Sequence, residues 1–131
     1  MAGEALFVGW GQVVRGREQL ALGVFMELLG YYGQLQEEGR IASFDPVLLA
    51  PHGGDLAGFV VVRGEQSALD SVRSSPDFLR LVTRAGAVVD NIGVVSAYTG
   101  EALGELMAMF SEISDGLPSE VASRMRLSRR T

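Results

Sequence analysis

The stretch GFVVVRGEQSALDSVRSSPDF, residues 58–78, decides the fold that the sequence predicts. Its run of β-branched residues ends at a glycine, and the helical pattern that follows is interrupted by a proline. A continuous apolar run of this length is typical of a strand whose two faces are both covered. Ser67 with Asp70 predicts a capping box at a helix start, and Ser75 with Pro76 predicts a second start. The stretch therefore predicts a buried strand followed by one kinked helix or two short ones.

Hydrophobic periodicity on either side of this stretch defines the remaining elements. Alternating apolar residues predict strands at 5–14, 41–50 and 88–99. Apolar spacings of three and four predict helices at 17–38 and 101–116, and Gly39 is suited to end the first. The stripe of that first helix runs through Leu20, Val24, Leu28, Tyr31 and Leu35. The order β-α-β-β-α-β plus a C-terminal helix predicts an α+β, ferredoxin-like sandwich, with the strand containing Pro46 at a sheet edge.

Composition predicts a folded chain with one domain at residues 1–116 and a polar, arginine-rich tail at 117–131. The 131 residues are 47% apolar and 21% charged, and the formal net charge is −5. The acidic balance argues against a nucleic-acid partner. Apolar runs are too short to span a membrane, and no leader is evident, so we expect a cytoplasmic protein without a membrane partner. The tail arginines are expected to be solvated, with an anionic partner as the alternative: Arg124, Arg126, Arg129 and Arg130.

Missing residue types exclude several kinds of chemistry. The chain has no cysteine, which excludes disulfides, thiolate metal sites and cysteine nucleophiles. All eleven basic residues are arginines, so Schiff-base chemistry and a phosphate-binding P-loop are excluded as well. We interpret this arginine bias as codon usage in a GC-rich, bacterial genome. With one histidine and no suggestive spacing of acids, neither a metal site nor a cofactor is expected.

The predicted sheet is apolar on both faces, which predicts self-association. The strands at 5–14, 56–64 and 88–99 carry apolar residues in both alternating sets, whereas two crossover helices cover one face only. The other face would expose on the order of 600 Å², more than a monomer usually leaves to water. Covering it is worth roughly 15 kcal/mol gross at about 25 cal/mol per Å². The C-terminal helix, about 21 Å long, is too short to cover it, so we predict a homodimer with its sheets packed face to face.

The segment GFVVVRGEQSALDSVRSSPDFLRL resembles the third strand and second helix of the dimeric α+β barrel superfamily. Its small members include YCII-related proteins and cofactor-free monooxygenases. The resemblance rests on a strand, a capped helix and a serine-proline step followed by an aromatic, here Ser75, Pro76 and Phe78. The element order agrees over residues 5–100. The resemblance implies a ferredoxin-like protomer, a dimer formed through the sheets and a pocket between sheet and helices, but no particular activity.

Two sets of candidate site residues emerge. His52 and Asp55 in the turn PHGGD are candidates for an acid-base pair, although turns attract polar residues in any case. His52 does not match the position of the histidine that YCII-like members are suspected to use, so no catalytic residue is carried over. Trp10, Arg63 and Tyr98 are candidates for ligand binding, because they are amphipathic or polar side chains near the ends of apolar strands.

Gln12 and Ser96 accompany this ligand-binding set, and Arg63 is suited to hold a carboxylate. The alternative is that Arg63 and Gln12 simply reach solvent. The segment GWGQVV, residues 9–14, nearly matches a dinucleotide-binding fingerprint but lies within a strand. We interpret its glycines, Gly9 and Gly11, as positions where a helix packs closely on the strand.

Three functions follow from this sequence. The first is a homodimeric α+β barrel protein that binds a small apolar or aromatic ligand or merely retains the pocket, with no activity assigned. The second is an enzyme of the cofactor-independent oxygenase or isomerase type, which lacks a convincing base. The third is a non-catalytic assembly module that docks through Met107, Met109 and Phe110 and the arginine tail.

Overall fold

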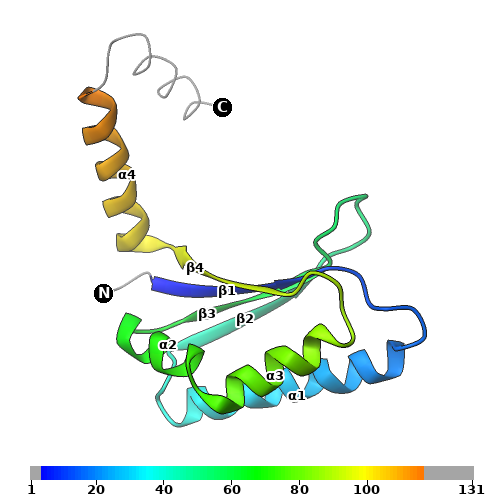
Figure 1. Cartoon of the computed structure of the whole chain (residues 1–131). Coiled ribbons are helices and arrows are strands. Elements are labelled where there is room, and N and C mark those ends of the chain that lie inside the picture. The colour runs from blue at the N-terminus through cyan, green and yellow to red at the C-terminus, as the bar shows by residue number, and fades with distance from the viewer. Residues whose placement is uncertain (1–3, 117–131) are drawn as a thin grey trace.

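A computed structural model describes residues 4–116 as one antiparallel sheet with helices on both sides of it (Figure 1). The elements follow in the predicted order, and the interrupted helix is two separate helices. Their bounds are β1 Glu4–Trp10, α1 Glu18–Glu37, β2 Ser43–Leu48, β3 Gly58–Arg63, α2 Gln66–Arg73, α3 Pro76–Gly86, β4 Gly93–Tyr98 and α4 Gly100–Asp115. The predicted α+β, ferredoxin-like arrangement is confirmed. The three strands predicted at 5–14, 41–50 and 88–99 are shorter than expected, and β1 already ends at Trp10.

The strand order β2-β3-β1-β4 places β1 and β3 at the centre. Pro46 lies in β2 at an edge of the sheet, as its missing N–H predicted. Val8 faces Val60 on one side and Val94 on the other, so these side chains share one face. Helices α1, α2 and α3 cover this face (Figure 1), and we call it the helix face.

The core lies between the helix face and these helices. Its largest fully buried side chains include Tyr32 and Phe78, from α1 and α3. Burial raises the pKa of the Tyr32 phenol, and the neighbouring Tyr31 adds to the effect, so Tyr32 stays neutral in the folded chain. The predicted stripe of α1 is correct except at Leu20, which is 64% exposed, because the helix turns that position away from the sheet.

Helix ends show where local sequence signals were right and where they failed. Gly39 follows α1 with a φ of +73°, and the Arg40 amide donates to the Leu35 carbonyl at 2.9 Å, as in a glycine-terminated helix. The capping box predicted at Ser67 is wrong. The N-cap residue of α2 is Glu65, two residues earlier than predicted, and Ser67 lies inside the helix.

Ser75 caps α3 and provides a test of the helix boundary. Its hydroxyl accepts a hydrogen bond from the Phe78 amide at 3.3 Å, and Pro76 takes the first helical position. We expect Ser75→Ala to lower the free energy of unfolding by about 1 kcal/mol, because this amide loses its acceptor. Ser67→Ala is the matched control and should leave stability within about 0.5 kcal/mol. Urea denaturation followed by circular dichroism measures both; a larger loss for Ser67→Ala would contradict the boundary.

The opposite face of the sheet, which we call the far face, is apolar and faces away from α1, α2 and α3. The rings of Phe7 and Phe59 stack there with centroids 5.1 Å apart, and Val61 continues the surface along β3. Val95 on β4 is 55% exposed. The far face therefore carries an apolar surface that the described residues leave open.

Helix α4 does not lie across the far face. It follows β4, contacts that strand and extends away from the sheet on the side opposite to α1 (Figure 1). Its apolar side chains are substantially exposed, including Met107 at 38%, Phe110 at 39% and Ile113 at 48%. The far face and this helix together present apolar side chains without a partner in the described part of the chain.

Two predictions concern residues that the structure does not describe. The arginine tail and the proposed boundary after residue 116 lie outside residues 4–116. Among the described residues, no helix is both long enough and apolar enough to cross a membrane.

Candidate functional site

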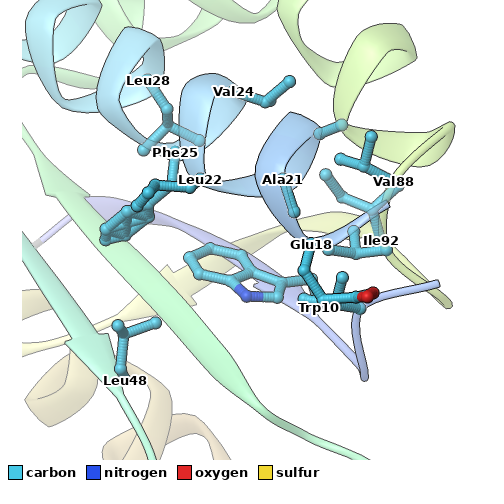
Figure 2. A pocket seen from close by; sticks show the side chains of 13 residues that line it. Trp10, Glu18, Ala21, Leu22, Val24, Phe25, Leu28, Leu48, Val88 and Ile92 are labelled. Carbon is cyan, nitrogen blue, oxygen red and sulfur yellow. The ribbon is translucent and has the colours of Figure 1, made fainter. Parts of the chain in front are cut away.

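A cavity of about 270 Å³ lies between α1 and the end of the sheet where β1 stops (Figure 2). Trp10 forms its wall on the sheet side, and Phe25 and Leu28 of α1 lie opposite. The remaining lining residues come from the segment after β1, from α1, from the end of β2, from the end of α3 and from the region after α3. They are Val13, Glu18, Ala21, Leu22, Val24, Leu48, Ala85, Val88, Val89 and Ile92. All of these side chains except Glu18 are apolar.

The Trp10 ring is held in place by its contacts on both sides. It meets the Phe25 ring edge-on, with centroids 6.1 Å apart and an interplanar angle of 67°. On the sheet side it lies against Gly58, where an added Cβ would come within 2.8 Å of the indole. Gly58 therefore provides the space in which the indole lies, and the indole in turn forms one wall of the cavity.

Backbone pairing fixes the segment that follows β1. The Gly11 amide donates to the Asp90 carbonyl at 2.7 Å, and the Val14 amide donates to the Val88 carbonyl at 2.8 Å. The Arg17 guanidinium also donates to the carbonyl of Ala87 at the end of α3. These bonds join the start of α1 to the end of α3 beside the cavity. The backbone groups that they pair at this end of the cavity are therefore already hydrogen-bonded within the protein.

The interpretation of Gly9 and Gly11 as helix-packing positions is wrong. Gly9 lies on the far face, where an added Cβ would meet the Phe7 ring at 2.6 Å. At Gly11 an added Cβ would meet the carbonyl oxygens of Asp90 and Asp55 at 3.0 and 3.1 Å. Both glycines permit a close approach, but the neighbours are a side chain of the same strand and two loops rather than a helix.

Glu18 is the only charged residue of the cavity lining. It occupies the first position of α1, and its carboxylate accepts hydrogen bonds from the Gly16 amide, the shorter at 2.8 Å. Gly16 has a φ of +86°, a conformation that favours glycine, and this turns its amide toward Glu18. Figure 2 shows the Glu18 carboxylate close to Trp10 at the edge of the cavity.

The structure separates the three predicted ligand-binding residues. Trp10 lines the cavity, whereas Arg63 pairs across the sheet with Ala5, and Tyr98 pairs with Glu4. At about 3.4 Å per residue, these positions lie roughly 17 Å or more from Trp10 along β1. The alternation of side chains places Arg63 on the far face, opposite to Trp10.

The side-chain partner of Arg63 is the carboxylate of Asp45 on the edge strand β2. Both side chains are substantially exposed, so the pair lies at the border of the far face and contributes little to stability. Tyr98 is 53% exposed at the end of β4. Neither residue belongs to the cavity.

His52 and Asp55 lie in the loop between β2 and β3, outside the cavity. His52 Nε2 is 2.8 Å from the Leu56 carbonyl, and its Nδ1 accepts from the Gly54 amide at 3.2 Å. Donation to a carbonyl requires the proton on Nε2, which leaves Nδ1 as the acceptor. Both ring nitrogens of His52 thus bond to the backbone of its own loop, and neither bond involves Asp55.

The cavity contains lining residues that sequence reasoning assigned to the core. Val24 and Leu28 belong to the predicted apolar stripe of α1, and such a stripe has the same spacing whether it packs against a core or lines a cavity. Ala21 and Phe25 widen this stripe and also line the cavity. Glu18 could not be recognised from the sequence as a lining residue, because an acid in the first turn of a helix is common. Within residues 4–116, no three His, Asp or Glu side chains are grouped to hold a metal ion.

Comparison with known proteins shows the fold. No family model matches the chain, and no curated protein matches it in sequence. A dimeric protein of unknown function with a ferredoxin-like fold from Bacteroides fragilis is 9% identical, with a TM-score of 0.54 over 73% of this chain and 96% of that one. A ferredoxin-like dabb family protein from Mesorhizobium loti is 13% identical, with a TM-score of 0.57 over 75% of this chain and 98% of that one.

SnoaB, a cofactor-independent oxygenase from Streptomyces nogalater, has the same arrangement. It is 19% identical to this chain, with a TM-score of 0.52 over 76% of this chain and 95% of SnoaB. At these identities the likeness concerns the fold alone. The chain is thus an α+β protein of the ferredoxin-like class, similar to proteins among which some are dimeric and one is an oxygenase.

Proposed function

We propose that this protein binds a small apolar or aromatic ligand in the cavity beside Trp10. The observation that carries the proposal is the lining: a cavity of about 270 Å³ whose side chains are apolar except for Glu18. A cavity of about 150 Å³ with such a lining is large enough for benzene, so this one has room for a substituted ring. Ligand pockets of proteins are mostly apolar with a few polar groups, which is the composition found here.

A cavity-filling substitution tests this function. Ala21 lines the cavity, and Ala21→Phe would place a ring inside it. We expect 4-tert-butylbenzyl alcohol to change the fluorescence of Trp10, the single tryptophan of the chain, and to raise the melting temperature of the natural protein. In Ala21→Phe the affinity should fall by at least about tenfold, which corresponds to roughly 1.4 kcal/mol.

Ala42→Phe is the control, because Ala42 is exposed outside the cavity. It should bind the alcohol as the natural protein does. Equal binding by Ala21→Phe and Ala42→Phe would show that the ligand lies elsewhere. The absence of a saturable response in the natural protein, across a panel of substituted benzenes, would remove the proposed function.

We also propose that the protein acts as a homodimer formed through its far face. The far face carries Phe7, Phe59 and Val61, and α4 leaves it uncovered. Burying on the order of 600 Å² on each of two copies gives about 1,200 Å², the lower end of stable interfaces. The dimeric state of the ferredoxin-like protein from Bacteroides fragilis supports the proposal.

The Arg63–Asp45 pair at the border of the far face would then belong to a polar rim around an apolar centre. Exposed apolar residues of α4, such as Met107 and Phe110, are available to extend this contact. Kinship with YCII-related proteins, a bacterial source and a cytoplasmic location stay predictions from the sequence.

An oxygenase remains the alternative function, and the named activity of SnoaB supports it. Among the lining residues only Glu18 is ionisable, so it is the one side chain of the lining available as a base. The acid-base role predicted for His52 and Asp55 stays a prediction, and their loop lies outside the cavity.

A further inference from the structure

The charge at the edge of the cavity indicates the class of ligand that it accepts. We propose that the cavity selects aromatic ligands that carry a hydrogen-bond donor, a protonated amine or a hydroxyl, and discriminates against aromatic carboxylates. The group responsible is the carboxylate of Glu18. This inference rests on the proposed function, because it names the ligand class for the same cavity.

The Glu18 carboxylate has acceptor capacity left for a ligand. Its hydrogen bonds within the described chain both come from the Gly16 amide, with Oε1 and Oε2 at 3.2 and 2.8 Å from that nitrogen. An ionised carboxylate offers about four lone-pair positions, so a donor on the ligand can still be accepted.

Neighbouring cations do not reverse this preference. Arg15 and Arg17 precede Glu18, but neither is part of the cavity lining, and the Arg17 guanidinium donates to the Ala87 carbonyl. Asp90 adds a second acid at the same end of the sheet, where its backbone pairs with Gly11 and Gln12. Arg63, the residue that the sequence suggested for a carboxylate, lies at the other end of β1 on the opposite face. A carboxylate ligand would thus meet a negative group and no cation in the lining.

Three ligands of similar shape separate the effect of the ligand's charge on affinity from the effect of its apolar contact with the cavity. They are 4-tert-butylbenzylamine, 4-tert-butylbenzyl alcohol and 4-tert-butylbenzoate, and calorimetric titration of the full chain at neutral pH gives their dissociation constants. We expect the amine to bind about tenfold more tightly than the benzoate, with the alcohol between them, since an exposed carboxylate attracts or repels a neighbouring charge only modestly. The difference in affinity between the amine and the benzoate should become smaller at high salt, because the Glu18 carboxylate and the charge on the ligand are partly open to solvent.

Glu18→Gln identifies the group responsible. In this variant the dissociation constants of the amine and the benzoate should differ by about twofold or less. The alcohol should bind nearly as before, because the shape of the cavity is kept. Glu37→Gln is the matched control. It makes the same change in net charge on the same helix, at its far end, and should preserve the tenfold difference.

The outcomes distinguish this inference from the proposed function. If none of the three probes binds, the cavity is not a ligand site and both proposals fall. If the natural protein binds all three equally, or prefers the benzoate, the binding function stands and the selectivity assigned to Glu18 is wrong. An equal loss of selectivity in Glu18→Gln and Glu37→Gln would assign the preference to the overall charge of the protein, which also overturns the inference.

Discussion

Phe59→Glu should convert the proposed dimer into monomers. The Phe59 ring stacks on Phe7 at the middle of the far face, and the substitution would remove this apolar contact from both copies. Each copy would lose about 2 to 3 kcal/mol of burial and would place an unpaired carboxylate against an apolar surface. We therefore expect the dissociation constant of the dimer to rise by at least about a thousandfold, which corresponds to roughly 4 kcal/mol.

Size-exclusion chromatography with light scattering measures this change at micromolar concentration. Met26→Glu is the control, because Met26 is 61% exposed on α1, on the side of the molecule away from the far face. It should remain a dimer. If Phe59→Glu stays dimeric while its circular dichroism is unchanged, the contact between copies lies elsewhere, for instance on α4.

Phe78→Ala should cause the largest loss of stability. The Phe78 side chain is 2% exposed and belongs to the core between α3 and the sheet. Removing a buried ring costs about 3 to 5 kcal/mol, because the transfer free energy is lost and a cavity remains. A domain of this size is stable by about 5 to 15 kcal/mol, so the variant should unfold at a much lower denaturant concentration.

Leu79→Ala, at the next residue of the chain, is the control for Phe78→Ala. Leu79 is 54% exposed, and its truncation should change the free energy of unfolding by less than about 1 kcal/mol. Urea denaturation at one fixed protein concentration compares the two, because the stability of a dimer depends on concentration. Similar losses for Phe78→Ala and Leu79→Ala would contradict the assigned core.

Much of the fold was predictable because its signals are local and agree with one another. Alternation in β3 placed Val60 and Val61 on opposite faces of the sheet, and Pro46 identified the edge strand. Ser75 and Pro76 marked the start of α3 correctly. The capping box at Ser67 failed, because a serine followed by an acid three residues later also fits the first turn of a helix that has already begun.

The site was less predictable, because its formation depends on contacts between distant segments. Trp10 was singled out as amphipathic and lines the cavity, but its neighbours Phe25 and Val88 come from α1 and from the region after α3. Their positions around the cavity follow from packing and from backbone pairing such as that of Gly11 with Asp90. Residue type alone also grouped Arg63 with Trp10, although strand register places Arg63 of β3 beside Ala5, at the other end of β1 from Trp10.

Sedimentation equilibrium of the full chain at low micromolar concentration tests the central claim most directly. That claim is that a sheet with apolar residues on both faces hides its second face against another copy. We expect a mass of twice the 14.0 kDa chain. A single-chain mass across the whole concentration range would show that no second copy covers the far face, and it would contradict the account.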